Sequence, residues 1–175
     1  MAVEIRLLND HELSAANKFF NNVYKINRSE KDFYWEFFNG PNGKAIYVGA
    51  IEDDNVDLKI VGIQCAIPLE LIGSDGTKIL TAKSEDTLVD PTYRGQKLFE
   101  KMYDVLVEKC KERGVKYIWG FTPAAKAFLR IGFEIPFQAS QALLVTKPIP
   151  AFRHLSGLNP ANRLVDTAKI LCLSF

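Results

Sequence analysis

The hydrophobic and polar residues of the chain follow two periods, and each period predicts a type of secondary structure. Apolar and polar residues alternate over residues 3–8, which predicts a short first strand. Asn9, with Glu12 three residues later, forms a capping-box pattern that predicts a helix ending near residue 24. A second helix is expected from its N-cap, Ser29, to residue 38.

Three β-rich runs follow, and short turn-forming sequences separate them. The expected strands are residues 44–51, 58–72 and 77–89. The turn sequences are Asp53-Asp54-Asn55 and Gly73-Ser74-Asp75-Gly76, and both are compatible with hairpins. Consecutive strands joined by short loops imply an antiparallel meander.

The next stretch has the helical period. Every fourth position is apolar in a helix that is expected to start near residue 96 and to stop at Gly114. These apolar positions are Leu98, Met102, Leu106 and Cys110. A strand is expected over residues 116–121, and the helical crossover places it parallel to strand 77–89. Pro123, favoured at a first helical position, predicts a short helix that Gly132 ends.

The C-terminal part has a different pattern. Residues 133–147 are expected to form a strand or a strand pair, and the chain beyond Pro148 a loop with a helix or a final strand. We therefore expect a domain of residues 1–147 and a C-terminal extension of residues 148–175. If the last helix ends freely, a second copy of the chain would have to cover its apolar face, which leaves a homodimer open.

These elements predict a mixed α+β fold. Its central sheet is mixed, mostly antiparallel and flanked by helices. Because one strand of the parallel central pair ends at Val89 and the other near Phe121, a gap is expected where the two strands diverge.

Composition and charge exclude several classes of protein. A net charge of +1 over 175 residues argues against a dedicated nucleic-acid binder. The three cysteines have no short spacing, so we expect buried thiols in a reducing compartment and neither a disulfide set nor a metal site. No stretch is apolar enough for a membrane span, and the N-terminus has no signal core. A cytoplasmic protein without a membrane partner is the expectation.

Residues 88–99 are the stretch that most clearly suggests a binding site. They predict a strand that stops before Pro91, which cannot donate to a ladder, followed by a tight turn and the start of a helix. A helix N-terminus has unpaired N–H groups and the positive end of the helix dipole, so a turn that opens there suits a phosphate. Arg94 adds a positive charge, and the residues alone predict an anion site.

The same stretch resembles motif A of the GNAT superfamily of acyl-CoA N-acyltransferases. Motif A reads Arg or Gln, two residues, Gly, one residue, then Gly or Ala. Arg94 matches the first position, and the preceding residues match the usual approach to the motif. Gly132-Phe133-Glu134 matches a later landmark of the family. Lys97 and Phe99 depart from the pattern at its two small positions.

This resemblance implies acetyl-CoA as a cosubstrate and no metal. The pantetheine arm is expected to pair with the strand backbone at Leu88, Val89 and Asp90. The Val89 N–H is also the expected donor to the oxyanion. The pyrophosphate is expected next to Arg94, on the N–H groups of Gly95, Gln96, Lys97, Leu98 and Phe99. The Lys97 side chain either contacts the phosphates or is an exposed first-turn lysine.

The reaction needs a base, because an amine with a pKa of about 10.4 is almost fully protonated near pH 7. Glu85 and Asp86 are the candidates, since they lie on the strand that leads into the motif. Adjacent strand residues face opposite sides of a sheet unless a bulge intervenes, so one of the two is expected to face the acyl group. We favour Glu85, and each residue is otherwise an exposed strand position.

The family often protonates the leaving thiolate with a tyrosine four residues before the Gly-Phe landmark. Phe128 occupies that position here, within the expected cofactor site. Three alternatives stay open: Tyr103 or Thr122 replaces the missing hydroxyl, the thiolate leaves unassisted, or the protein does not turn over.

The two N-terminal helices are rich in aromatic residues, most of which are expected in the core. Because the first two helices flank the acceptor in the family, Tyr34 and Trp35 are candidates to bind it. The leading hypothesis is an N-acyltransferase that moves an acetyl group from acetyl-CoA to a primary amine of a small molecule or an amino sugar by direct attack. The alternative is a CoA-binding regulatory or structural protein with little or no turnover.

Overall fold

A computed structural model of the chain describes residues 3–52, 58–122 and 124–136. The chain divides into two compact units, residues 1–133 and 134–175, and the description below concerns the first. Its strands are β1 (Val3–Leu7), β2 (Ile46–Glu52), β3 (Lys59–Ile72), β4 (Lys78–Val89) and β5 (Tyr117–Trp119). Its α-helices are α1 (Leu13–Tyr24), α2 (Glu30–Phe38), α3 (Leu98–Glu112) and α4 (Ala125–Arg130). Two 3-10 turns, Asp10–Glu12 and Pro91–Tyr93, precede α1 and α3.

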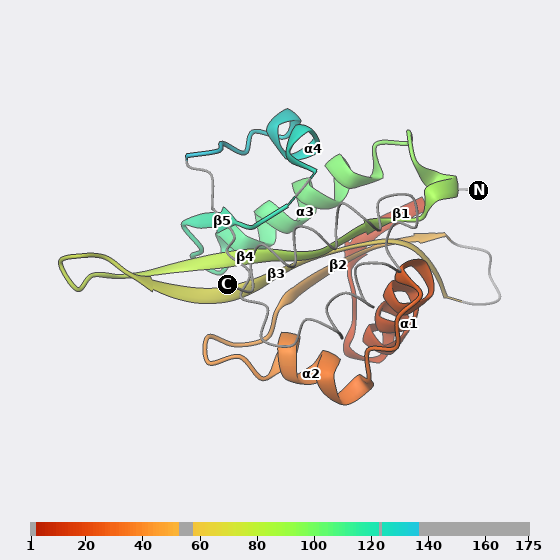
Figure 1. Cartoon of the computed structure of the whole chain (residues 1–175), viewed down its shortest axis with the longest axis horizontal. Coiled ribbons are helices and arrows are strands. Elements are labelled where there is room, and N and C mark those ends of the chain that lie inside the picture. Colours follow the sequence, from red (N-terminus) through yellow and green to blue (C-terminus); the bar gives the residue numbers. More distant parts are fainter. Residues whose placement is uncertain (1–2, 53–57, 123, 137–175) are drawn as a thin grey trace, which may run out of the picture. The chain divides into compact units, whose positions relative to one another are not determined.

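The five strands form one sheet in the order β1-β2-β3-β4-β5. The first four strands pair antiparallel, and β4 pairs parallel with β5. Figure 1 shows the sheet between two layers of helices, with α3 and α4 over one face and α1 and α2 over the other. The predicted meander, the parallel pair and the mixed α+β class are confirmed.

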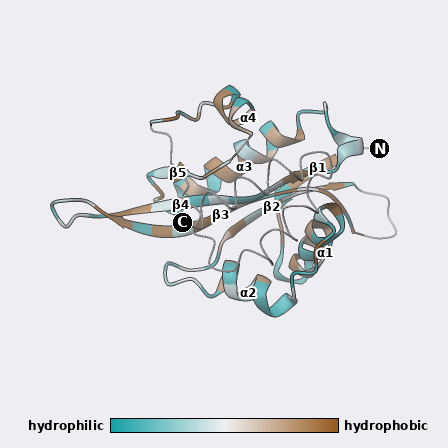
Figure 2. Ribbon diagram, viewed as in Figure 1, coloured by the Kyte–Doolittle hydropathy of each residue, from teal (hydrophilic) through white to brown (hydrophobic). Residues whose placement is uncertain are grey.

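Each face of the sheet has its own hydrophobic core. Leu98, Met102 and Leu106 of α3 are buried on one face, as their fourfold spacing predicted. Phe33 and Phe37 of α2 are buried on the other face, with Cys65 of β3 among their neighbours. Figure 2 shows hydrophilic residues on the outer part of α2. Phe33 and Phe37 are thus the fully buried part of the predicted aromatic core, and Phe19, Phe20 and Phe38 pack against it.

The predicted helix starts are confirmed for the first two helices. The Asn9 N–H donates to Glu12 Oε2 at 2.7 Å, as a capping box requires, although the first turn is a 3-10 turn. Ser29 caps α2 by accepting a hydrogen bond from the Asp32 N–H at 3.1 Å.

Two predicted helix starts are wrong by two residues. The helix expected from about residue 96 begins at Leu98, because Lys97 has the left-handed φ of 58° and ends the turn before it. The helix expected to have Pro123 at its first position begins at Ala125. The Thr122 hydroxyl accepts a hydrogen bond from the Ala124 N–H at 3.0 Å and closes the turn before that helix. The elements expected beyond residue 136, and the boundary at residue 147, lie outside the described residues.

Candidate active site

A β-bulge lies in β4 just before the turn that leads to α3. Glu85 pairs with Cys65 of β3, and Leu88 pairs with Ile63, so two residues of β4 stand opposite Gln64. Asp86, the first of those two residues, has a left-handed φ of 47°. Aspartate is one of the few residues besides glycine that tolerate this conformation.

The bulge corrects the expected directions of Glu85 and Asp86. Cys65, the partner of Glu85, belongs to the core under α1 and α2, so Glu85 faces that side. Asp86 faces the same side, because its carboxylate contacts Arg28 of the α1–α2 loop and Tyr47 of β2. The expectation that the two residues face opposite sides is therefore wrong. The extra residue of the bulge shifts the alternation of β4 by one position, so both carboxylates lie on the face covered by α1 and α2. This face is called the acceptor face below, because the sequence leads us to expect the acceptor beside these two helices.

Asp86 is the best-anchored carboxylate of the acceptor face. Arg28 Nη2 lies 2.7 Å from Asp86 Oδ2, and Arg28 Nη1 lies 3.2 Å from Oδ1. The Tyr47 hydroxyl also donates to Oδ2. Burial raises the pKa of Tyr47 well above its usual value, and the nearby Cys65 and Asp86 add to the rise, so the phenol remains a hydrogen-bond donor at neutral pH.

Arg28 is held in place from several directions. Its Nε donates to Asn17 Oδ1 of α1 at 2.9 Å. Its guanidinium carbon lies 4.1 Å from the ring centre of Phe20, and the rings of Phe33 and Phe37 are within 5.0 Å. The Arg28–Asp86 ion pair thus ties the two N-terminal helices to the bulge of β4.

β4 pairs with β3 along one edge and with β5 along the other. Beyond the end of β5, the second edge of β4 has no neighbouring strand among the described residues, and it is called the open edge below. The pairing of β4 with β5 runs from Thr81 to Lys83, and in the part of the chain that the structure describes it does not continue toward Val89. The Asp90 N–H donates to Val61 O of β3 at 2.8 Å. Because successive residues of a strand point their backbone groups to opposite edges, the Val89 N–H points to the open edge.

The turn between β4 and α3 exposes the groups that the sequence assigned to a phosphate. Arg94, Gly95, Gln96 and Lys97 are all exposed, and α3 starts directly after them. Gly95 has a φ of 85°. Lys97, which stands where the motif has glycine, also has a left-handed φ. The backbone therefore has the conformation that glycine favours even though the side chain is lysine.

A polar network anchors this turn at its other side. Asp90 Oδ1 accepts a hydrogen bond from the Thr92 N–H at 2.8 Å. The Tyr93 hydroxyl donates to Glu52 Oε2 at 2.6 Å and accepts from Lys59 Nζ at 2.8 Å. Glu52 and Lys59 lie at the adjoining ends of β2 and β3, far from Tyr93 in sequence. No pattern in the sequence marked this contact, since it depends on the pairing of distant strands.

Phe99 and Phe128, two of the departures from the family pattern, meet in one aromatic cluster. Their ring centres are 5.3 Å apart with the edge of one ring toward the other. Tyr103 of α3 lies 5.0 Å from Phe99 and 5.6 Å from Phe128, centre to centre. Phe133 completes the cluster at 5.2 Å from Phe128. The Phe99 ring packs inward, so it leaves the exposed side of the turn clear.

Tyr103 brings a buried hydroxyl group to β4, beside the end of its pairing with β5. Its oxygen lies 2.6 Å from Ser84 Oγ, at the point where β4 leaves β5. Gln64 Nε2 donates to the same Ser84 hydroxyl at 3.1 Å. Gln64 is fully buried, and its Oε1 has no hydrogen-bond partner among the described residues. Burial raises the pKa of Tyr103 to about 12, so the phenol keeps its proton at neutral pH.

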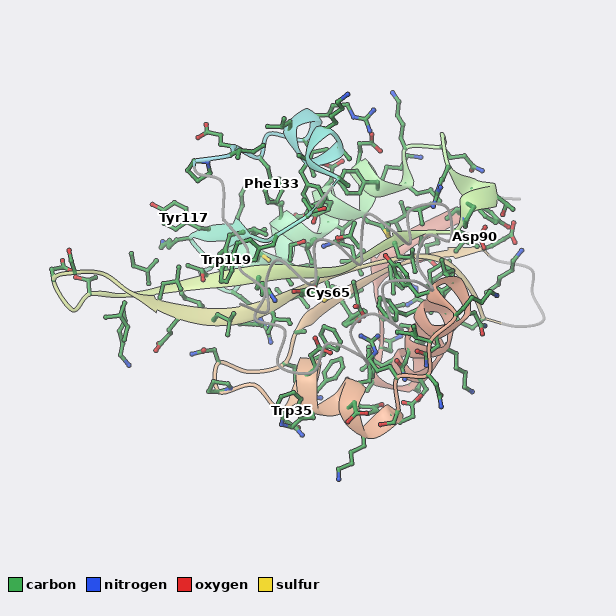
Figure 3. The ribbon with its side chains drawn as sticks, viewed as in Figure 1. Trp35, Cys65, Asp90, Tyr117, Trp119 and Phe133 are labelled. Carbon is green, nitrogen blue, oxygen red and sulfur yellow. The ribbon has the colours of Figure 1, made fainter. Side chains whose placement is uncertain are left out.

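The two aromatic residues expected to bind the acceptor lie on the less buried side of α2. Trp35 is 71% exposed and stands between Phe33 and Phe37, whose side chains point to the sheet. Figure 3 shows Trp35 on the side of α2 away from the strands. Tyr34 is partly exposed and packs edge-on against Phe33.

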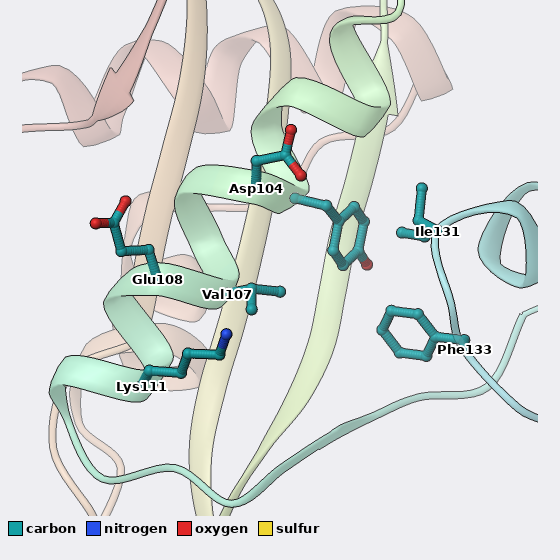
Figure 4. A pocket seen from close by; sticks show the side chains of 7 residues that line it. Asp104, Val107, Glu108, Lys111, Ile131 and Phe133 are labelled. Atoms are coloured by element: carbon teal, nitrogen blue, oxygen red, sulfur yellow. The ribbon is translucent and has the colours of Figure 1, made fainter.

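A hollow of about 480 Å³ lies beside α3, away from the motif turn. Figure 4 shows its wall, to which Asp104, Val107, Glu108 and Lys111 of α3 contribute together with Ile131 and Phe133. The hollow shares Tyr103 and Phe133 with the aromatic cluster described above.

Two further kinds of site are missing from the described residues. No group of three or more His, Cys, Asp or Glu residues there is arranged to hold a metal ion. No helix in these ranges has both the length and the apolar character needed to cross a membrane.

Comparison of the sequence with models of known families identifies the family of the chain. The model described as "Acetyltransferase (GNAT) domain" matches residues 4–135, which is most of the chain and includes the bulge, the open edge and the motif turn. The chain belongs to the GNAT acetyltransferase family. The expected family and the expected class, an acyltransferase enzyme, are confirmed.

Solved structures agree with this family at the level of the fold. A predicted acetyltransferase from Clostridium acetobutylicum, solved with acetyl-CoA, has a TM-score of 0.66 at 17% identity and covers 82% of this chain and 97% of its own. Glucosamine-6-phosphate N-acetyltransferase from Arabidopsis thaliana has a TM-score of 0.63 at 15% identity, with 84% and 100% covered. An aminoglycoside acetyltransferase from an uncultured soil sample, in complex with sisomicin, has 0.63 at 18%, with 83% and 97% covered. No curated protein matches the chain.

Several residues beside the motif of this GNAT protein were not selected from the sequence. Arg28 and Tyr47 hold Asp86, and neither stood out in the sequence, because each is a lone polar residue until the sheet forms. Gln64 and Ser84 escaped notice for the same reason. A glutamine in the middle of a β-rich run is the signal in the sequence that could have pointed to this region.

Proposed function

We propose that this GNAT protein transfers an acetyl group from acetyl-CoA to a primary amine of a small molecule. One observation carries the proposal. The open edge of β4, with the Val89 N–H turned toward it, continues directly into an exposed turn at the N-terminus of the 15-residue helix α3. A thioester carbonyl and a pyrophosphate on one ligand need those two features next to each other.

The residues of the chain fit acetyl-CoA as a cosubstrate. The N–H groups of the first turn of α3 have no helical partners, and they suit the pyrophosphate. Arg94 and Lys97 place two exposed positive charges next to them. The backbone groups of residues 88–90 that face the open edge suit the amides of the pantetheine arm. Phe99, Phe128 and Tyr103 supply an apolar wall between α3 and α4.

Direct attack by the amine then requires three groups of the protein: a donor to the oxyanion, a donor to the leaving sulfur and a base. The Val89 N–H stabilises the oxyanion that forms on the thioester carbonyl. The Tyr103 hydroxyl takes the role of the family tyrosine that Phe128 replaces, and donates a hydrogen bond to the departing sulfur. A carboxylate of the acceptor face removes a proton from the amine, which approaches between α2 and β4.

The acceptor is proposed to be an amine that is positively charged in solution, such as an amino sugar. Glu36, Glu85 and Asp86 place three carboxylates on the acceptor face, against the cations of Arg28 and Lys83. The surplus of negative charge favours a cationic acceptor. The named acceptors of two structural neighbours, glucosamine-6-phosphate and an aminoglycoside, are amino sugars or their derivatives.

Two measurements test the proposal. Calorimetric titration with acetyl-CoA is expected to show saturable binding, and Arg94→Ala is expected to weaken it about tenfold, with Arg130→Ala on the exposed side of α4 as the control. Thiol release in the presence of a panel of amines is then expected with at least one amino sugar. Tight binding without thiol release from any amine would favour the alternative, a CoA-binding protein without turnover.

A further inference from the structure

Three carboxylates lie on the acceptor face, and the proposed function needs one of them to take a proton from the acceptor amine. We propose that this group is Glu36 of α2. The inference rests on the proposed function, and it selects a residue that differs from Glu85, the candidate favoured by the sequence.

Asp86 is unsuited to the task because its oxygens are already occupied. Oδ1 accepts from Arg28, and Oδ2 accepts from both Arg28 and Tyr47. The side chain is 6% exposed, so an incoming amine would have to displace the guanidinium to reach it. Asp86 is a positioning residue, which holds the bulge that sets the direction of the Val89 N–H.

Glu85 is bound to a cation on its own strand. The Lys83 ammonium forms an ion pair with Glu85 Oε1, and each of these side chains is about one-third exposed. The Glu85 carboxylate is therefore already engaged by an ammonium group, and an acceptor amine would have to compete with Lys83 for it.

The position of Glu36 suits a general base. It follows Phe33 by three residues and precedes Phe37, so it lies along the edge of the helix face that packs on the sheet. Its side chain is 44% exposed and makes no hydrogen bond among the described residues. Arg28 Nη1 approaches one of its oxygens at 3.9 Å, which leaves that carboxylate beside the Arg28–Asp86 pair.

The surroundings of Glu36 raise its pKa, and with it the proton affinity of the carboxylate. Burial raises the pKa of Glu36, repulsion by Asp86 and Glu85 raises it further, and Arg28 and Lys83 oppose the rise. A carboxylate with a raised pKa is a better general base near neutral pH. Glu36 differs in this respect from an ordinary surface glutamate.

The Glu36 carboxylate takes one proton from the acceptor ammonium, and the free amine attacks the thioester carbonyl. The carbon–sulfur bond breaks, and the sulfur leaves with its electron pair. The second proton lost by the nitrogen goes to that thiolate, while Glu36 releases its proton to water. The products are an N-acetylated amine, a free thiol and one proton.

The test compares the amide variants of the two glutamates with a carboxylate control on the same helix. Glu36→Gln is expected to lower kcat at least 100-fold and to abolish the acidic limb of the pH profile of kcat/KM, with acetyl-CoA affinity unchanged. Glu36→Asp should recover part of kcat. Asp32→Asn, at the exposed first turn of α2, is expected to leave kcat within threefold.

The outcomes separate this inference from the proposed function. If the native protein acetylates an amine and Glu36→Gln keeps kcat within threefold or retains the acidic limb, the role of Glu36 is overturned. A larger loss in Glu85→Gln than in Glu36→Gln would return the role to Glu85. If the native protein binds acetyl-CoA but acetylates none of the amines, the proposed function fails, and the base role fails with it.

Discussion

Replacing Arg28 with methionine tests the structural role of the ion pair that holds the bulge of β4. Methionine keeps much of the length of the side chain, but it removes the guanidinium, which lies over the Phe20 ring. The two hydrogen bonds to Asp86, at 2.7 and 3.2 Å, and the bond to Asn17 at 2.9 Å are then lost. Asp86 remains buried with one strong partner, the Tyr47 hydroxyl.

The size of the effect follows from the burial of both partners. The side chains of Arg28 and Asp86 are 11% and 6% exposed. Removing one partner of a buried ion pair costs about 3–5 kcal/mol, because the remaining charge loses its compensation. An exposed ion pair contributes about 0–1 kcal/mol. Arg130, which lies 3.9 Å from Glu100 and is 71% exposed, offers that comparison within the same chain.

Urea denaturation at pH 7 measures the free energy of unfolding of each variant. We expect Arg28→Met to lower it by about 3–5 kcal/mol and Arg130→Met by less than about 1 kcal/mol. Combining Arg28→Met with Asp86→Asn should recover about half of the loss, because the orphaned charge is gone. A loss below about 1 kcal/mol for Arg28→Met, or strictly additive effects in the double variant, would show that the ion pair is not what holds this region.

Three further predictions concern the motif turn, the leaving group and the response to acid. Lys97→Gly is expected to raise the free energy of unfolding by about 0.5–1 kcal/mol, because glycine adopts the left-handed φ of 58° without strain; a decrease in urea denaturation would contradict this. Tyr103→Phe is expected to lower kcat about tenfold with acetyl-CoA affinity unchanged, and an unaltered kcat in a thiol-release assay would remove Tyr103 from the mechanism. Hydrogen bonds from Arg6, and from the Asn9 N–H, lower the pKa of Glu12 to about 2 in the folded protein. A lowered pKa stabilises the fold above about pH 4.5 and loses its effect as the pH falls through 2, so Glu12→Gln should destabilise by about 2–3 kcal/mol at pH 7 and far less at pH 2. Equal losses at the two pH values, measured by denaturation, would refute that account.

The sequence predicted the strands and helices well because their signals are local. The fourfold spacing of Leu98, Met102 and Leu106 and the capping sequence at Asn9 depend on neighbouring residues, and the structure confirms both. The start of α3 was wrong by two residues because the left-handed Lys97 breaks the pattern without glycine. The local sequence pattern does not reveal that a lysine adopts a left-handed backbone conformation.

The sequence predicted the motif turn of the site but not the directions of its carboxylates. The turn after Val89 carries a motif, so its place at a helix N-terminus followed from the sequence. The directions of Glu85 and Asp86 did not, because the bulge shifts the alternation of β4 and its position depends on the pairing with β3. Glu36 was not selected, since only the packing of α2 on the sheet brings it beside Arg28.

A crystal structure of the protein with acetyl-CoA tests the central claim most directly. We predict that the thioester carbonyl oxygen lies about 3 Å from the Val89 nitrogen and that the pyrophosphate contacts the N–H groups at the start of α3. The acetyl group should be open to the acceptor face beside Glu36. Acetyl-CoA bound elsewhere, for example in the hollow beside Asp104 and Glu108, with the edge of β4 left free, would contradict the account.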